Sequence, residues 1–355
     1  MTTHCPNCKS EAKIYIKGNK IPLVNNFKRD KKLYNTDFYY CRKCDLGFLK
    51  YFHPDQKLYN KFYLYKGELN KSKIKFVTFA LKNVIKKKTS VLEIGGGDGY
   101  LGKILKKSVN YKNIDPSSLR GFKTTNIFFD DKKIQKKFDI IICLNVLAHI
   151  DNPINLIKKI KNVMHKNTKI LFSVQNGLEQ IKSGYLDNIY HEHKYYYSVY
   201  SFKNRISKIL ENLNYYKYPL HGESIVATNI NLKLKKYKIN KSSIKLNKIK
   251  EAEVKYKKTL KLIKNKIKKS SSVVYGVGCA PRSLKLLYDL GESSKKIKYI
   301  IEPKNSRKLN IKLPKKNIKV VYRDEVKIGS KYTVIWFPWH IKPPKIFQNL
   351  IWPYH

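Results

Sequence analysis

Residues 91–99 read VLEIGGGDG, a short apolar segment that runs directly into a glycine-rich turn. Residues 91–94 predict a buried strand, and the glycines that follow have the spacing G-x-G-x-G. Glycine suits such a turn because the backbone must adopt conformations closed to other residues while it approaches a ligand closely. A dinucleotide fingerprint would need another glycine at position 100, where this chain has Tyr100. The stretch therefore predicts a Rossmann-like strand, turn and helix without the usual dinucleotide signature.

Strand-like and helix-like segments alternate on both sides of this turn. The apolar periodicity predicts helices at 71–88, 101–107 and 154–164, and further strands at 110–114, 138–144 and 169–174. The run at 138–144 is almost continuously apolar, as a parallel strand buried on both faces requires. This rhythm predicts an α/β fold built on a doubly wound, mostly parallel sheet.

A chain of 355 residues is too long for one typical core. Residues 1–68 show no long helix and form a unit of their own. A lysine-rich helical stretch at 240–270 acts as a bridge, and a second strand–helix unit begins at 273, with further strands at 297–301 and 334–337. We therefore predict three domains, at 1–68, 69–235 and 236–355.

Four of the six cysteines form two C-x-x-C pairs, Cys5 with Cys8 and Cys41 with Cys44. Two such turns can aim four thiolates at one point and complete a tetrahedral site. Zinc suits this geometry, and iron in a rubredoxin-like site is the main alternative. With four protein ligands the site would be closed, so we expect one structural, non-catalytic metal ion per chain.

The formal net charge of +50 invites a nucleic-acid interpretation. Arginine, however, supplies only seven of the 75 basic residues, and arginine is the residue that recognises phosphates and guanine edges with two parallel bonds. Lysine is spread along the chain with isoleucine, asparagine and tyrosine, as A/T-rich codons would produce. We expect loose, salt-sensitive binding of polyanions and no specific nucleic-acid partner.

No apolar run approaches the roughly 20 residues that a bilayer span needs, and no export signal follows Met1. The sequence therefore predicts a cytoplasmic protein without membrane insertion, present as a monomer or homodimer.

Acidic residues flank the glycine turn. Glu93 ends the strand before it, Asp98 lies within it, and Asp115 stands at the end of the next strand, where it can accept hydrogen bonds from both ribose hydroxyls. This combination resembles class I SAM-dependent methyltransferases, although another Rossmann-like nucleotide site is the alternative. The resemblance implies S-adenosyl-L-methionine as the cofactor, bound by Glu93, Gly95, Gly97, Asp98, Gly99, Asp115 and Asn145.

Two further stretches concentrate polar side chains where a doubly wound sheet places its ligands. Residues 145–150 read NVLAHI at the end of the fourth strand, and residues 187–193 read DNIYHEH beyond the fifth. A metal site at the second stretch is disfavoured, because His191 and His193 at i and i+2 do not share a helix face and no third ligand is evident.

Together these motifs resemble the nucleotide-sugar C-methyltransferases that methylate 4-keto-6-deoxy sugars. The resemblance covers nearly the whole chain and rests on motifs that occur in the family's order: the double C-x-x-C pattern, Tyr63-Leu64-Tyr65, the glycine turn, Asn145–His149, Tyr190-x-Glu192-His193, His221-Gly222-Glu223 and Tyr275-Gly276. It implies a small zinc-binding domain, then a class I methyltransferase domain, then a second Rossmann-like domain that closes over the sugar nucleotide.

In this family's reaction, a carbon next to a ketone must lose a proton before it attacks the methyl group of SAM. A neutral histidine suits that step, and a placed base contributes about 10²- to 10⁴-fold. The resemblance makes His193 the base, with Glu192 and Tyr190 orienting it or handling the enolate oxygen. His149 and Tyr65 would stabilise the charge on that oxygen. The substrate-binding residues that the resemblance implies are His221, Glu223, Tyr275 and Arg282.

The chain departs from the family at Glu223, where a second glycine is usual, at residues 277–282 and at Trp339-His340. All three departures lie where the nucleotide sugar is expected. O- or N-methylation of another small molecule is therefore an alternative, as is a binding protein without catalysis. An RNA-modifying enzyme is the third alternative, although no N/D-P-P-Y motif follows the fourth strand.

Overall fold

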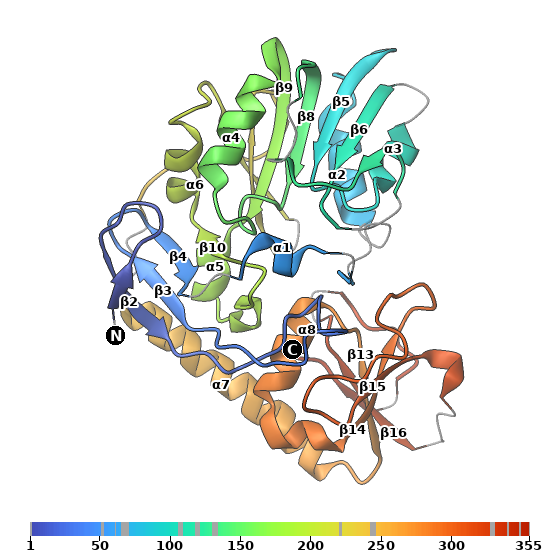
Figure 1. Ribbon diagram of the computed structural model, residues 1–355. Helices are drawn as coiled ribbons and strands as arrows, with labels where there is room; N and C mark the ends of the chain where they lie inside the picture. The colour runs from blue at the N-terminus through green and yellow to red at the C-terminus, as the bar shows by residue number, and fades with distance from the viewer. Residues whose placement is uncertain are drawn as a thin grey trace.

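The computed structural model describes residues 2–50, 53–60, 62–64, 71–105, 109–117, 121–129, 134–219, 222–241, 246–326, 331–338, 341–347 and 349–354. These residues form three β-sheets. Figure 1 shows the central sheet at the top, the N-terminal sheet at the left and the C-terminal sheet at the lower right. The α/β class and the parallel sheets that the sequence predicted are both present.

The first sheet is antiparallel and has the order β1-β2-β3-β4-β10. Its strands are β1 (Thr2–His4), β2 (Glu11–Ile16), β3 (Phe38–Cys41), β4 (Leu46–Leu49) and β10 (Tyr195–Tyr197), and the short helix α1 (Asp55–Leu58) follows β4. β10 comes from far along the chain, yet Tyr195 pairs with Phe48 and Tyr197 with Leu46. This pairing ties the segment just after His193 to the N-terminal sheet.

The central sheet has the order β11-β12-β9-β8-β5-β6-β7. Its strands are β5 (Thr89–Ile94), β6 (Val109–Ile114), β7 (Thr124–Thr125), β8 (Phe138–Leu144), β9 (Met164–Gln175), β11 (Asn214–Tyr218) and β12 (Ser224–Thr228). Strands β5 to β9 pair in parallel, whereas β12 runs antiparallel to both neighbours. The chain leaves β5 to one side through β6 and returns to its other side through β8, so the sheet is doubly wound and has its switch point between β5 and β8.

Helices cover this sheet and connect its strands. They are α2 (Lys71–Leu81), α3 (Tyr100–Leu105), α4 (Pro153–Asn162), α5 (Gly177–Lys182), the 3-10 turn η3 (Leu186–Asn188) and α6 (Val199–Ile206). α2 is shorter than the predicted 71–88. After Leu81 the chain turns, with Val84 N–H donating to Leu81 O at 2.9 Å, and the left-handed Lys88 (φ 67°) leads it into β5. Val84 and Ile85 are therefore half-buried and pack against the core from a turn rather than from a helix.

The third sheet is entirely parallel and has the order β15-β14-β13-β16-β17. Its elements are β13 (Val273–Val277), α8 (Pro281–Asp289), η4 (Gly291–Lys296), β14 (Ile297–Glu302), β15 (Lys319–Tyr322), η5 (Arg323–Glu325), β16 (Tyr332–Trp336) and β17 (Asn349–Ile351). The predicted second strand–helix unit is therefore present, and it builds a Rossmann-like sheet at the C-terminal end.

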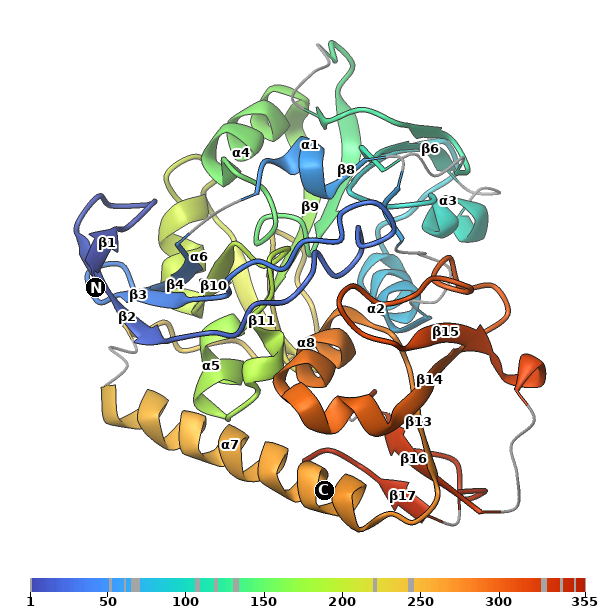
Figure 2. The same cartoon turned by 60° about the horizontal axis from the view of Figure 1, so that its bottom comes forward.

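The long helix α7 (Leu246–Lys269) joins the central and C-terminal parts and has 24 residues. Its apolar side chains recur at helical spacing and are buried, at Ile249, Ala252, Tyr256, Ile263 and Ile267, while most of its lysines face solvent. It contacts α5 and β2 towards one end and η4 towards the other, and Figure 2 shows it along the outside of the molecule. Within the described residues, every helix is too short or too polar to span a membrane.

Candidate active site

A cavity of about 930 Å³ opens at the carboxyl ends of the central parallel strands. Its walls come from the central sheet and from segments next to the other two sheets. The glycine turn after β5, Asp115 after β6 and Asn145 after β8 form one side, residues 280–283 at the start of α8 form another, and Asn25, Asp55, Tyr59 and Tyr63 come from the N-terminal part. Ligands of doubly wound sheets bind at this edge, next to the switch point. The cavity is therefore the candidate active site.

The glycine turn has the backbone geometry that the sequence predicted. Gly95, Gly97 and Gly99 have φ of 70°, 63° and 67°, a region that other residues rarely adopt. A Cβ atom at Gly95 would lie 2.3 Å from Cγ2 of Val146. Side chains are therefore excluded from Gly95 both by backbone conformation and by the loop after β8, and the turn leaves open space in front of it.

Carboxylates hold the turn in place. The backbone N–H of Gly97 donates to Oδ2 of Asp115 at 2.7 Å, and Ser117 N–H donates to Oδ1 at 2.9 Å. Oδ1 of Asp98 accepts from the N–H of Tyr100 at 3.2 Å, where α3 begins. Asp115 and Asp98 both line the cavity, so they combine a structural contact with access to a ligand.

Glu93 has a different place from the one expected of a cofactor ligand. Its carboxylate is fully buried, forms an ion pair with Lys73 at 2.7 Å and accepts a hydrogen bond from the Tyr111 hydroxyl. A Cβ atom at Gly96 would lie 2.6 Å from it. Glu93 therefore packs against the glycine turn inside the protein and is not among the residues that line the cavity.

His193 and Tyr190 form a hydrogen-bonded pair inside the cavity. Nδ1 of His193 lies 3.1 Å from the carbonyl oxygen of Asn188, which can only accept, so Nδ1 carries the proton. Nε2 then presents its lone pair and accepts from the Tyr190 hydroxyl at 2.9 Å. The two rings lie 4.1 Å apart. The arrangement fixes one tautomer and aims a basic nitrogen at the position of the Tyr190 oxygen.

Glu192 lies in the same cavity and is almost fully buried. Burial raises the pKa of its carboxyl group to about 7, against the lowering effect of hydrogen bonds from Asn25 and Tyr63 and of the positive charge of Lys308. Nδ2 of Asn25 donates to Oε2 at 3.1 Å, and the Tyr63 hydroxyl donates to the same oxygen at 3.2 Å. A carboxyl group that titrates near neutral pH is suited to proton transfer.

The ring of His149 contacts that of His193 edge to face, with the ring centroids 4.9 Å apart and the rings nearly perpendicular. Burial, and to a smaller extent the charge of Lys194, lowers the pKa of His149 to about 4, so its ring is neutral at pH 7. Nδ1 of His149 is hydrogen-bonded to the hydroxyl of Tyr59 at 3.0 Å.

Several residues singled out from the sequence do not meet in the cavity. Tyr65, His221 and the Trp339-His340 pair lie outside the described residues. Tyr275 lies within β13 with its ring stacked against Tyr299 at 6.4 Å, and Glu223 forms an ion pair with Lys217 and accepts from Tyr237. Neither Tyr275 nor Glu223 lines the cavity.

Arg282 does line the cavity, but its guanidinium group is engaged. Nε donates to Oδ2 of Asp187 and NH2 donates to Oδ1, both at 2.9 Å. The hydroxyl of Tyr354 donates to the same carboxylate at 3.0 Å. This two-point pair fixes the start of α8 against the segment that leads to Tyr190.

His191 points away from its neighbours in sequence. Its Nε2 donates to the carbonyl oxygen of Asn35 at 3.2 Å, and its ring lies 5.2 Å from that of His53. It is absent from the cavity lining. Within the described part of the chain, the group with metal-ligand geometry is the cysteine cluster.

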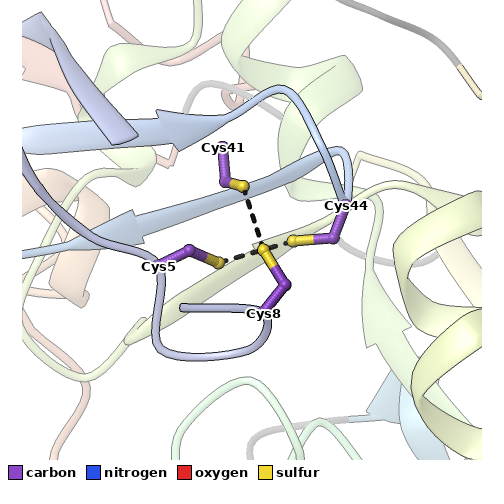
Figure 3. A group of neighbouring side chains, drawn as sticks. All are labelled: Cys5, Cys8, Cys41 and Cys44. Carbon is purple, nitrogen blue, oxygen red and sulfur yellow. Dashed lines mark hydrogen bonds between the residues drawn. The ribbon is translucent and has the colours of Figure 1, made fainter. Parts of the chain in front are cut away.

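The four cysteines converge on one point, as Figure 3 shows. Cys5 and Cys8 come from the turn between β1 and β2, Cys41 is the last residue of β3, and Cys44 lies in the turn between β3 and β4. The Sγ atoms of Cys5 and Cys44 are 3.4 Å apart, and those of Cys8 and Cys41 are 3.5 Å apart. A tetrahedral ion with metal–sulfur bonds of about 2.3 Å needs sulfurs about 3.8 Å apart, so the cluster fits zinc with a small expansion.

The sequence did not reveal Asn25, Tyr59 or Tyr63 as lining residues. Their partners, Glu192 for Asn25 and Tyr63 and His149 for Tyr59, lie 90 to 167 positions further along the chain. Tyr63 alone had a signal, since it belongs to a tyrosine-rich motif shared with the family that the chain resembles.

Comparison with known proteins gives one family match. Residues 65–209 match the model of a family described as a methyltransferase domain. No curated protein matches the chain.

The solved structures similar to this chain include the YcgJ protein from Bacillus subtilis, with 10% identity, 46% of this chain and 99% of that chain covered, and a TM-score of 0.34. The N-methyltransferase NodS from Bradyrhizobium japonicum has 10% identity over 47% and 98% of the two chains, with a TM-score of 0.34. The plantazolicin methyltransferase BpumL, solved with S-adenosylhomocysteine, has 17% identity over 46% and 84%, with a TM-score of 0.35. The residues that match the methyltransferase-domain model contain strands β5 to β9 of the doubly wound central sheet.

Proposed function

We propose that this protein is a SAM-dependent methyltransferase and that it transfers the methyl group to a carbon next to the ketone of a nucleotide-linked 4-keto-6-deoxy sugar. The observation that carries the proposal is the hydrogen-bonded pair of Tyr190 and His193, which shares one cavity with the glycine turn. Methyl transfer to oxygen or nitrogen uses a lone pair of that atom and removes no proton from carbon. Transfer to the carbon next to a ketone needs a base that removes the C–H proton and a donor that stabilises the enolate oxygen.

The residues around the glycine turn fit SAM. The turn leaves room for a close ligand, and Asp115 stands at the end of β6, where its carboxylate can accept from ribose hydroxyls in addition to Gly97. Asn145 and Asp98 line the same part of the cavity. When bound, SAM supplies an activated methyl group on a sulfonium whose departure needs no acid.

His193 acts as the general base through Nε2. As the proton moves from the sugar carbon to Nε2, the imidazole becomes positively charged, and the carbonyl oxygen of Asn188 stabilises the Nδ1–H that points at it. The Tyr190 hydroxyl, which donates to Nε2 in the structure, turns its hydrogen towards the enolate oxygen that forms. One rearranged hydrogen bond thus supplies both the base and the oxyanion donor.

His149 and Glu192 complete the proposed site. His149 is neutral at pH 7, so its imidazole N–H can donate a hydrogen bond to the enolate oxygen and keep its proton. Glu192 lies beside the base with a pKa near 7 and orients the acceptor or takes over the proton. The nucleotide part lies towards residues 280–283 at the start of α8, and the cysteine cluster binds zinc as a structural ion.

The test is a mass-spectrometric turnover assay with SAM and a panel of TDP-, CDP- and GDP-linked 4-keto-6-deoxy sugars. We expect a product one methylene heavier from the wild-type protein. His193→Ala should lower turnover by about 10²- to 10⁴-fold and keep the affinity for SAM. His165→Ala is the matched control, because His165 pairs with Asp139 away from the cavity and should retain wild-type turnover.

Near-normal turnover by His193→Ala would remove this histidine from the mechanism. An absence of product across the panel, with SAM binding intact, would exclude the sugar acceptor and favour another small molecule or RNA. A methylated sugar that loses the methyl group under O- or N-demethylating conditions would contradict transfer to carbon.

A further inference from the structure

Asn25 belongs to the loop between β2 and β3 and reaches the cavity from the N-terminal sheet. It is only 2% exposed. The side-chain nitrogen Nδ2 donates to Oε2 of Glu192, and the backbone carbonyl of Asn25 accepts from the N–H of Leu64 at 2.8 Å. These contacts hold the amide group in one orientation, because the amide nitrogen, and not the oxygen, can donate to a carboxylate.

The other end of the same amide is unsatisfied. Oδ1 of Asn25 is buried and has no hydrogen-bond partner among the residues that the structure describes. Buried carbonyl oxygens are nearly always paired in folded proteins, because leaving one without a donor costs free energy. An unpaired acceptor in the wall of a cavity therefore indicates a ligand that brings its own donor.

The position of Asn25 in the cavity points to the methyl acceptor, rather than the cofactor, as this ligand. Its amide contacts Glu192, the residue next to the base His193, whereas the glycine turn is held by different contacts, with Asp115 and with Ile114 O. The donor that Oδ1 requires thus lies on the side of the cavity where the acceptor is deprotonated. On a sugar ring this donor is a hydroxyl group.

We infer that Oδ1 of Asn25 accepts a hydrogen bond from a ring hydroxyl of the acceptor sugar, so that the zinc-bearing domain takes part in choosing the substrate. The inference rests on the proposed function. Asn25 thereby becomes a specificity-determining residue: it positions Glu192 through Nδ2 and recognises the sugar through Oδ1. A site built around such an acceptor rejects an analogue that lacks the hydroxyl, because the carbonyl oxygen is then left buried without a donor.

The experiment compares kcat/KM for the sugar that is turned over with kcat/KM for each of its monodeoxy analogues. The wild-type protein should favour one hydroxylated sugar over its deoxy analogue by about tenfold or more. Asn25→Ala should bring this ratio close to one, and Asn25→Asp, which keeps an acceptor oxygen, should retain much of it. The ratio is insensitive to a general loss of activity, since both substrates meet the same enzyme.

Asn26→Ala is the matched control. Asn26 is a buried amide in the same loop, but its Nδ2 donates to the carbonyl oxygens of Lys57 and Leu58, and it does not line the cavity. This variant should keep the wild-type ratio even if its stability falls.

An unchanged ratio in Asn25→Ala for every analogue would overturn the inference alone. So would a loss of SAM affinity with an unchanged ratio, because the donor would then belong to the cofactor. If the wild-type protein turns over no sugar of the panel while it binds SAM, the proposed function fails and takes this inference with it.

Discussion

The carboxyl group of Glu192 has no charged partner at hydrogen-bond distance among its described contacts, which are the amide of Asn25 and the hydroxyl of Tyr63. Burial raises its pKa to about 7, above the ordinary value of 4.5. The folded protein therefore keeps this proton to a higher pH than the unfolded chain does. The stability that this difference provides is present below about pH 4.5 and is lost as the pH rises through 7.

Glu192→Gln should remove this dependence, because glutamine imitates the protonated acid. A pKa difference of about 2.5 corresponds to about 3 kcal/mol. The free energy of unfolding of the variant, relative to the wild type, should therefore rise by about 3 kcal/mol between pH 4.5 and 8. Urea denaturation at several pH values measures it. For Glu211→Gln, at an exposed position, the free energy of unfolding relative to the wild type should not change with pH. The same constancy in Glu192→Gln would refute the raised pKa of Glu192.

Single residues also show how far the sequence could predict the site. The Tyr190, Glu192 and His193 motif pointed to a proton-transfer site, and the structure places all three in the cavity. Asn25 could not be found in this way, because its contact with Glu192 spans 167 positions and exists only once the N-terminal sheet has been docked on the rest. Local patterns carry no information about which loop a distant sheet will deliver.

At the scale of elements, the turn between β5 and α3 depends on glycine for two separate reasons. Gly95 has a left-handed backbone conformation, and any side chain at this position would also collide with Val146. Gly291 shares only the first requirement, because its φ is 60° and a Cβ atom added there would meet no other atom within 4 Å. The two positions thus separate backbone strain from steric conflict.

Gly95→Ala should weaken SAM binding by at least about tenfold, because the loop after β8 must shift to make room for the Cβ atom of the alanine. Gly291→Ala should cost about 1 kcal/mol of stability, from strain alone, and leave the affinity for SAM unchanged. Isothermal titration with SAM and thermal denaturation check both. Equal SAM affinities in the two variants would show that Val146 does not restrict the turn.

The elements with strong periodicity were predicted closely, and those that depend on partners were not. β8 was predicted at its observed bounds, 138–144, because a strand buried on both faces reads as a continuous apolar run. β9 begins at Met164, inside the segment predicted as helix, since Phe138 pairs with that residue. β10 was not predicted as a strand of the N-terminal sheet, because three tyrosines reveal neither a partner nor a register.

At the scale of the whole molecule, segments next to the N-terminal sheet form part of the cavity wall, so this sheet is not a separate appendage. It pairs with β10, and its loop and the segment after it bring Asn25 and Tyr63 to Glu192 and Tyr59 to His149. The buried Lys194 strengthens the connection, because it forms ion pairs with both Asp55 of α1 and Asp151 of the central domain. We therefore expect the loss of structure at the cysteine cluster to lower turnover, although the cluster does not line the cavity.

Removal of the metal should lower both the melting temperature and the turnover of the acceptor, since the small sheet has little core of its own. Cys41→Ser should reproduce the effect of a chelator and reduce the bound metal below one ion per chain. Elemental analysis, thermal denaturation and the turnover assay measure the three quantities. Cys279→Ser, a buried thiol outside the cluster, should keep the metal content. Metal-free protein that is folded and fully active would contradict a structural ion.

Helix α7 has a consequence for how the walls of the cavity are placed. Its 24 residues span about 36 Å, and it is anchored by contacts with β2 and α5 towards one end and with η4 towards the other (Figure 2). Because α5 and η3 belong to the central part of the chain, segments next to all three sheets lie along the same rod. The helix therefore acts as a common ruler for the three walls of the cavity.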